Sequence, residues 1–199
     1  MNKQFKILLM AALMMPLTSS AADIYFAGGI SQASQSNSVS AVATSTKSYT
    51  GYGVLGGFML SSEFGINTGF LYTEMGGHNN VGATTSFDEK APYYTIPIMA
   101  EWWFSPNFGL GGGLYYGFSA GNITDTGTSN GSNSFGAANY ANSDYGLAVN
   151  GQFAYPVTES FKLTAEAIWE YGLANVSTAN NVTLNNYSIL GLVGVGYHF

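Results

Sequence analysis

Apolar and polar residues alternate along most of this chain with a period of two, which is the pattern of strands buried on one face. In residues 161–171 the odd positions are aromatic or aliphatic, whereas the even positions include Lys162, Glu166 and Glu170. Gly, Asn, Ser and Pro cluster between segments of this kind. The pattern predicts eight strands, at 24–30, 49–60, 64–75, 94–104, 108–118, 145–155, 161–171 and 187–199.

The connections between the predicted strands are of two lengths that alternate along the chain. The short ones have two or three residues and lie at 61–62, 105–107 and 158–160. The long ones are rich in Ser, Asn, Thr and Gly and lie at about 35–48, 76–91, 119–143 and 174–186. Short periplasmic turns and longer outer loops are typical of outer-membrane barrels. With an even number of strands, both chain ends are expected on the periplasmic side.

The apolar faces of the predicted strands end in aromatic residues, such as Phe161 and Tyr171, or Phe108 and Phe118. Aromatic girdles on both sides of an aliphatic band are typical of the two bilayer interfaces. Since lipid cannot hydrogen-bond to backbone groups, a sheet that spans a membrane has to close on itself. The expected fold is all-β: an eight-stranded antiparallel transmembrane β-barrel with short periplasmic turns and four long extracellular loops.

Residues 1–22 have the three parts of a secretory signal peptide: a basic start, an apolar run and small residues. The apolar run, at 7–17, is too short to span the roughly 30 Å of hydrocarbon in a bilayer. We expect cleavage after Ala21 or Ala22, which leaves one exported domain at 23–199. Its expected location is the bacterial outer membrane.

Charged residues make up 8% of the chain, against roughly 25% in average soluble domains. The chain has no Cys, which excludes disulfides and Cys-based zinc or redox sites. It has no Arg and a net charge of −6, so nucleic-acid binding is not expected. Such a low charge fits a protein whose outer surface faces lipid.

Three segments, at 94–101, 170–176 and 190–199, resemble small bacterial outer-membrane β-barrel proteins. The resemblance is to the porin-like outer membrane protein beta-barrel family, similar in build to OmpX and the membrane domain of OmpA. It implies a lipid bilayer with lipopolysaccharide as the surroundings and the outer-membrane barrel assembly machinery as a partner. Alternate residues at the end of the chain resemble the signal that this machinery reads: Val195, Tyr197 and Phe199.

No catalytic residue, cofactor or metal site is expected. The strand map puts His78 in an outer loop and His198 at the periplasmic rim, so these two histidines cannot assemble one site with a nucleophile. Gly51, Gly53 and Gly56 have the spacing of a dinucleotide-binding loop. That mechanism requires a helix after the glycines, whereas here a strand pattern continues. Because the chain has only two histidines, a lipid-modifying enzyme is the weakest of the functions considered.

Four charged residues lie on the strand faces opposite the lipid-facing residues and are therefore expected to point into the lumen: Glu101, Lys162, Glu166 and Glu170. A charge on the lipid face near the midplane costs roughly 2–4 kcal/mol, which favours this placement. Residues four apart on one strand are about 13 Å apart, so their partners have to come from neighbouring strands. We interpret the group as a stabilising network, and alternatively as a cation-attracting lining.

Two functions remain open. The first is a non-enzymatic structural or surface-interaction role, of the adhesion type, in which loops carrying apolar residues such as Phe135 contact host or surface ligands. The alternative is a narrow porin or small-solute channel, because inward positions such as Gly111 and Gly113 are small and the lumen is acidic. An eight-stranded lumen is normally filled by side chains, and Met99 and Tyr115 are candidates to fill this one.

Overall fold

The computed structural model describes residues 22–39, 42–82, 84–128 and 130–199. All but the last residue of the predicted signal peptide therefore lies outside the described residues. Within the described ranges, no helix has the length and apolarity needed to cross a membrane. The strands are β1 (Ala22–Asn37), β2 (Val42–Ser45), β3 (Lys47–Met59), β4 (Phe64–Val81), β5 (Thr85–Trp103), β6 (Phe108–Ser119), β7 (Ile123–Gly127), β8 (Gly131–Asn133), β9 (Ser143–Pro156), β10 (Phe161–Gly172) and β11 (Leu184–His198).

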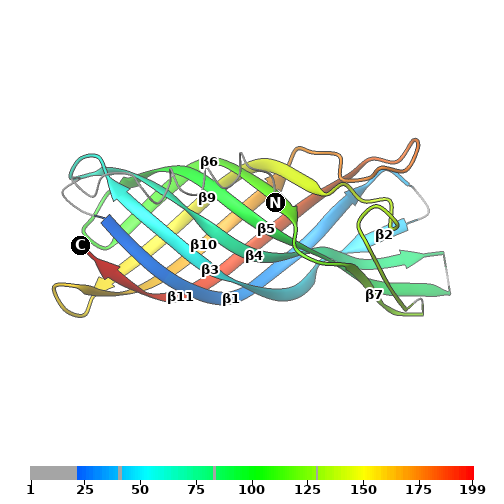
Figure 1. Cartoon of the computed structure of the whole chain (residues 1–199), viewed down its shortest axis with the longest axis horizontal. Helices are drawn as coiled ribbons and strands as arrows, with labels where there is room; N and C mark the ends of the chain where they lie inside the picture. The colour runs from blue at the N-terminus through cyan, green and yellow to red at the C-terminus, as the bar shows by residue number, and fades with distance from the viewer. Residues whose placement is uncertain (1–21, 40–41, 83, 129) are drawn as a thin grey trace.

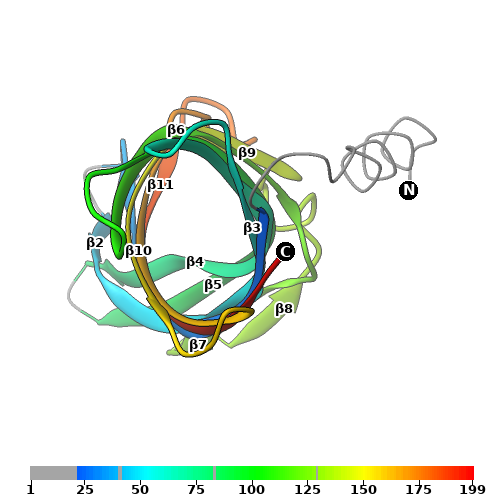
Figure 2. The ribbon, with the colours of Figure 1, turned by 90° about the vertical axis from the view of Figure 1, so that its left-hand side faces the viewer.

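Eight of these strands form a closed ring in the order β1-β3-β4-β5-β6-β9-β10-β11 (Figures 1 and 2). The ring closes because β1 pairs with β11, from Asp23 opposite His198 to Asn37 opposite Leu184. Every neighbouring pair in the ring is antiparallel. The predicted eight-stranded antiparallel barrel is therefore confirmed.

One end of the barrel carries both ends of the described chain and the three short turns, and we call it the terminal end (Figure 1). Ser61, Ser105 and Thr158 begin these turns in the same way. Each hydroxyl oxygen accepts hydrogen bonds from the backbone N–H groups two and three residues later, at 3.3 and 3.0 Å. Such local bonds favour tight turns. The positions of these turns agree with the prediction.

The opposite end, which we call the loop end, differs from the prediction. β4 and β5 have 18 and 19 residues and form a hairpin that projects beyond the rest of the ring (Figure 1). β2 pairs with β4, β7 with β5, and β8 with β7. Parts of 35–48, 76–91 and 119–143, which were expected as loops, are therefore strands. Apolar alternation does not mark them because these strands do not have one face against lipid.

β4 changes its pairing partner where it leaves the ring. Pairing with β3 ends at Gly51 opposite Thr73, and pairing with β2 begins at Ser45 opposite His78. Between these points Gly76 has a φ of 128°, a conformation that L side chains rarely adopt. Gly76 therefore lets one continuous strand serve both the barrel wall and the projecting sheet.

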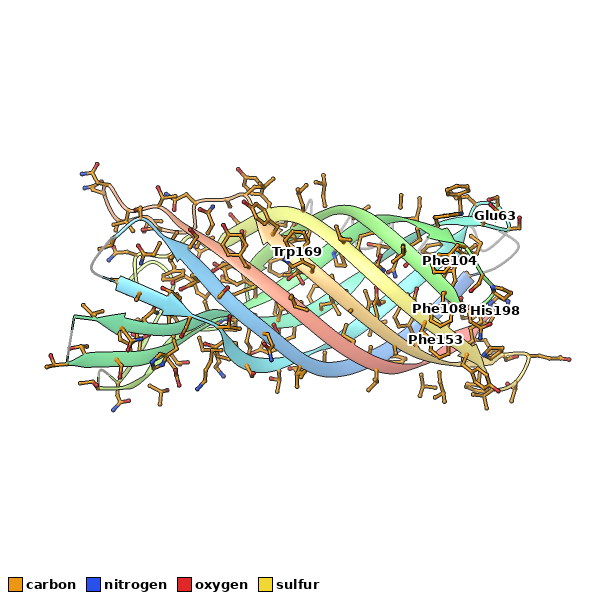
Figure 3. The ribbon with its side chains drawn as sticks, turned by 180° about the vertical axis from the view of Figure 1, so that it is seen from behind. Glu63, Phe104, Phe108, Phe153, Trp169 and His198 are labelled. Atoms are coloured by element: carbon orange, nitrogen blue, oxygen red, sulfur yellow. The ribbon has the colours of Figure 1, made fainter. Side chains whose placement is uncertain are left out.

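Aromatic rings form a row on the outer surface near each end of the ring. At the terminal end, the ring centroid of Phe108 lies 6.3 Å from that of Phe104 and 4.8 Å from that of Phe153. Figure 3 labels these three residues. Toward the loop end, Tyr52 stacks on Tyr72 with centroids 5.0 Å apart. The exposed residues between the rows include a band of aliphatic side chains: Val54, Ile66, Ile98, Leu110, Leu114, Leu147, Val149, Leu163, Ile189 and Val193. This arrangement matches the expected girdles and lipid-facing band.

Side chains fill the middle of the lumen and its part toward the loop end. Leu71, Met99 and Leu190 have no exposed surface, so no space large enough for water borders them. The inward glycines make room for neighbours, since a Cβ at Gly146 would lie 2.7 Å from the Tyr115 ring. Met99 and Tyr115, which were candidates to fill the lumen, therefore occupy the space that small residues leave in this part of the barrel.

Candidate functional site in the lumen

Two buried acidic side chains, Glu101 from β5 and Glu166 from β10, share hydrogen-bond donors inside the lumen. Asn150 Nδ2 donates to Oε1 of both carboxylates, at 2.8 and 2.5 Å. Asn67 Nδ2 also donates to both, at 3.0 and 3.3 Å, and the Tyr25 hydroxyl donates to Glu166 Oε2 at 2.9 Å. Among the described residues no cation lies within ion-pair distance of either acid. Amide and phenol donors therefore satisfy the two acids.

The barrel wall brings this network together from five strands, because Tyr25, Asn67 and Asn150 come from β1, β4 and β9. The space it needs comes from a sixth strand. A Cβ at Gly111 on β6 would lie 2.9 Å from Glu101 Cγ and would also meet the Asn150 amide oxygen. Gly111 thus accommodates the network instead of opening a pore.

The four charged residues predicted for the lumen lie in three separate places. Glu101 and Glu166 share the network described above. Glu170 is fully buried farther toward the loop end and accepts a hydrogen bond from Ser188 Oγ at 2.8 Å. Lys162 lies at the terminal end, where no glutamate forms an ion pair with it among the described residues. Partners come from other strands in each case, as the spacing along β10 predicted.

A charged cluster lies beside the closure of the ring at the terminal end. Lys162 Nζ donates to Asp23 Oδ1 and Oδ2 at 3.0 and 2.8 Å, and His198 Nδ1 lies 2.6 Å from Asp23 Oδ1. The three residues come from β10, β1 and β11. Figure 3 shows His198 at this rim, as predicted, on the same end as Glu63.

The sequence analysis missed Asp23, Tyr25, Asn67 and Asn150. Asn and Tyr carry no charge, so a search for charged inward positions does not find them. Asp23 stands directly after the predicted signal peptide, where the strand pattern has only just begun. The inward parity of all four residues is the signal that could have placed them beside the glutamates.

The lumen opens at the terminal end into a hollow of about 500 Å³, which we call the vestibule. Inward, the vestibule meets a second space of about 20 Å³, which we call the neck. Glu101, Gln152 and Thr164 line the neck, while Lys162 and Trp103 line both spaces. The lumen is therefore open to solvent from this end.

A buried cap closes the lumen at the loop end. Phe135, Tyr140 and Val176 come from the connections between strands and pack together with Met75 and Tyr93. The Tyr93 and Phe135 rings meet edge to face, with centroids 5.1 Å apart. The polar, non-periodic sequence around these residues did not predict such a core.

A chain of polar side chains supports the cap from below. The Tyr140 hydroxyl donates to Glu89, and Gln35 Nε2 donates to the Tyr140 hydroxyl at 2.8 Å and to Asn186 Oδ1 at 3.1 Å. Asn186 Nδ2 in turn donates to Asp144 Oδ2 at 3.0 Å. Glu89 lies beyond the aromatic row of the loop end, and burial raises the pKa of its carboxyl group above the ordinary value.

His78 belongs to β4 and not to a loop, which corrects the prediction of an outer-loop residue. Its Nδ1 lies 2.7 Å from Asp88 Oδ1, while Lys47 Nζ lies 2.7 Å from Asp88 Oδ2. Hydrogen bonds from Lys47 and His78 lower the pKa of Asp88. Among the residues with described positions, no group of three or more His, Asp or Glu side chains is arranged to hold a metal ion.

The family model of the outer membrane protein beta-barrel domain matches residues 6–199. The chain belongs to this family. The match, together with the barrel fold, places it in the bacterial outer membrane and among barrel proteins rather than enzyme families. A search of the curated proteins found no match.

Several solved structures of outer-membrane barrels are similar to this chain. The crystal structure of OprG from Pseudomonas aeruginosa is 15% identical, covers 89% of this chain and 96% of that chain, and has a TM-score of 0.51. Neisserial surface protein A is 16% identical, with coverages of 88% and 97% and a TM-score of 0.47. Ail of Yersinia pestis, solved with the heparin analogue sucrose octasulfate, is 15% identical, with coverages of 89% and 99% and a TM-score of 0.46.

The proposed assembly residues lie on the outer surface of the last strand and at the chain end. Val195, Tyr197 and Phe199 are 52%, 42% and 57% exposed. The Tyr197 ring contacts those of Phe161 and Phe199 with centroids 5.4 and 4.9 Å away. All three side chains are therefore accessible from the lipid side of the barrel.

Proposed function

We propose that this outer-membrane barrel is a non-enzymatic surface protein that binds an external ligand or surface through its loop end. The observation that carries the proposal is the projecting sheet of β2, β4, β5, β7 and β8, which extends past the ring (Figure 1). Binding residues are often found on loops that a rigid scaffold positions. Long connections in compact domains are commonly functional.

The cap supports this proposal because it makes the loop end a defined surface. Phe135 is 2% exposed and Val176 is fully buried, so the connections that carry them are held against the barrel. A binding surface that is ordered before contact loses less conformational entropy on binding. A cap with its own buried core is thus suited to recognition.

The proposed orientation has the terminal end facing the periplasm and the loop end facing the exterior. The short turns at the terminal end and the predicted signal peptide support it. An epitope inserted after Gly82, at the tip of the β4–β5 hairpin, should be labelled by antibody on intact cells. An epitope inserted after Glu159, in a terminal-end turn, should be labelled only after the outer membrane is permeabilised. The reverse pattern would contradict the proposed orientation.

Binding is tested by shortening the hairpin. Residues 78–88 are replaced by Asn-Gly, which joins Gly77 and Glu89, a pair directly opposite in the ladder, by a favoured two-residue turn. Display of the unaltered chain on otherwise non-adherent bacteria should confer adhesion to a surface coated with protein or glycan, or to plastic. Display of the shortened chain should not confer this adhesion. The control is Lys47→Ala with the full hairpin. Equal adhesion by the shortened protein, folded and displayed at the same level, would exclude the hairpin as the binding element.

A channel is the second candidate, and the vestibule favours it because it gives solutes entry into an acidic lumen from one end. The buried middle of the lumen and the cap support a barrel that does not conduct. Planar-bilayer recordings of the folded protein should show no conductance steps above background. Conductance steps whose size increases when the cap is removed would favour the channel.

We also propose that Val195, Tyr197 and Phe199 form the signal for the barrel assembly machinery, and that lipopolysaccharide contacts the outer aromatic row at the loop end. The accessible positions of the three residues support the first part. Phe199→Ala should lower the amount of folded protein in the outer membrane while leaving refolding in detergent unchanged. Unaltered amounts in cells would count against the signal.

A further inference from the structure

The neck at the inner end of the vestibule contains polar side chains without partners. Gln152 and Thr164 are 6% and 8% exposed, and neither side chain forms a hydrogen bond with any of the described residues. Glu101 is 3% exposed and uses only Oε1 in the network with Asn67 and Asn150. Gln152 and Thr164 border the neck, so a ligand or water in it can complete the hydrogen bonds of their polar atoms.

The size of the neck restricts what can enter it. Its volume of about 20 Å³ exceeds the ~10–15 Å³ that one water-sized group requires. A primary ammonium group is of that size, has three N–H donors and accepts no hydrogen bond. Glu101, Gln152 and Thr164 each offer an oxygen acceptor from a different strand, so the number of acceptors equals the number of donors.

The charge around the neck also favours a cation. Glu166 lies directly behind Glu101, with which it shares the Asn150 amide. The nearest positive group is Lys162, whose Nζ is held by both carboxylate oxygens of Asp23. The neck therefore has an acidic floor, and the cation at its entrance is already paired.

The vestibule has room for a chain attached to that ammonium group. Met59, Trp103 and Ala154 line both the neck and the vestibule and give an apolar wall for methylene groups. Glu63 lines the vestibule but not the neck, and its carboxylate can attract a second positive group. A linear aliphatic diamine combines these features, with one ammonium group in the neck and the other near the mouth.

We propose that the vestibule is a binding site for a short linear aliphatic diamine, which places one ammonium group in the neck against Glu101, Gln152 and Thr164. The ligand enters from the compartment that the terminal end faces. The site lies at the opposite end of the barrel from the proposed surface-binding sheet, so either proposal can fail without affecting the other.

The test uses the full mature chain folded in detergent micelles, with 1,4-diaminobutane as the probe and calorimetry as the measurement. Saturable binding is expected. 1-Butanol, which has no charge, and tetramethylammonium, which has no N–H donor and is too large for the neck, should bind at least tenfold more weakly, equivalent to about 1.4 kcal/mol. Equal binding of either control compound would overturn the proposal.

Two variants locate the site. Thr164→Val keeps the shape and removes the hydroxyl, and Gln152→Met keeps the length and removes the amide. Each should weaken diamine binding about tenfold, the effect of losing one hydrogen bond to a charged group. Thr73→Val is the matched control, because its buried hydroxyl also has no described partner but lies away from the neck. Unchanged affinity in both neck variants would overturn the proposal.

NMR and a further variant separate the remaining occupants. The Gln152 side-chain amide signal, identified by its loss in Gln152→Met, should shift on addition of diamine in the wild-type protein. If the wild type does not bind and Lys162→Met does, the side chain of Lys162 is itself the occupant of the neck and the proposal is wrong. If neither binds, the neck holds water only and the proposal is also wrong.

Discussion

The two ends of the barrel are stabilised in different ways. At the terminal end, hydroxyl groups form each turn with backbone groups two and three residues later, and the lumen is open to solvent. At the loop end, a cap with its own core closes the lumen and joins segments that are far apart in the sequence. The turns of the terminal end therefore depend on local sequence, whereas the cap of the loop end depends on tertiary contacts.

Phe135→Ala should give the largest effect, because Phe135 is the most centrally placed ring of the cap. Loss of a buried Phe side chain costs about 3–5 kcal/mol. The loss should be confined to the loop end and appear as faster amide exchange in the cap, with β9 and β10 unchanged. Leu173→Ala, at an exposed site near the same end, is the control and should have little effect. Equally fast exchange throughout the barrel would show that the two ends are one cooperative unit.

Asn150→Ala should come next and act on the middle of the barrel. It removes donors to both buried glutamates, and one hydrogen bond to a charged group contributes about 1.5–3 kcal/mol. We expect a loss of about 3 kcal/mol in urea unfolding of the protein in vesicles. Gln152→Ala, two residues along the same face of β9, should cost clearly less because its amide has no described partner. Similar losses in both variants would argue that packing, and not the shared carboxylate network, stabilises this layer.

Glu89→Gln should make the loop end less sensitive to pH. Burial raises the pKa of Glu89 in the folded protein, so its contribution to stability is present below the ordinary carboxyl pKa of about 4.3 and is lost as the pH rises through the folded value. Exchange in the cap, corrected for the intrinsic rate, should therefore accelerate from pH 4 upward in the wild type. The Gln variant should show a smaller change. Asp88 has a lowered pKa, so its contribution to stability has the opposite pH dependence and is lost as the pH falls.

Lys47→Ala should have the smallest effect. Its ion pair with Asp88 is partly exposed, and such pairs contribute about 0.2–1 kcal/mol and are screened by salt. Lys162→Ala at the terminal end should cost more, since that ion pair is less exposed and its acid also contacts His198. Urea unfolding at low and high salt compares the two, and a larger loss for Lys47→Ala would reverse the expected order.

The sequence predicted the ring well because lipid imposes a simple pattern on it. On β10 the outward residues, such as Leu163, are apolar, and several inward residues, such as Thr164 and Glu166, are polar. The cap had no such pattern, because Phe135 and Val176 are single apolar residues in polar segments and find their contacts only through the fold. The lumen network was half predicted. Parity predicted that Glu101 and Glu166 face the lumen. Their closeness to each other, and the amide groups that they share, depend on the register of five strands.

Closure of the ring through β1 and β11 has a consequence for how the protein forms. Pairs such as Asp23 and His198 join the first and last strands, so the ring stays open until the last strand is available. Until then two strand edges expose unpaired backbone groups, which invite pairing with other chains. Contacts of such long sequence separation also make folding slow. Loss of β11 should therefore leave a sheet with two free edges, and aggregation should compete with assembly.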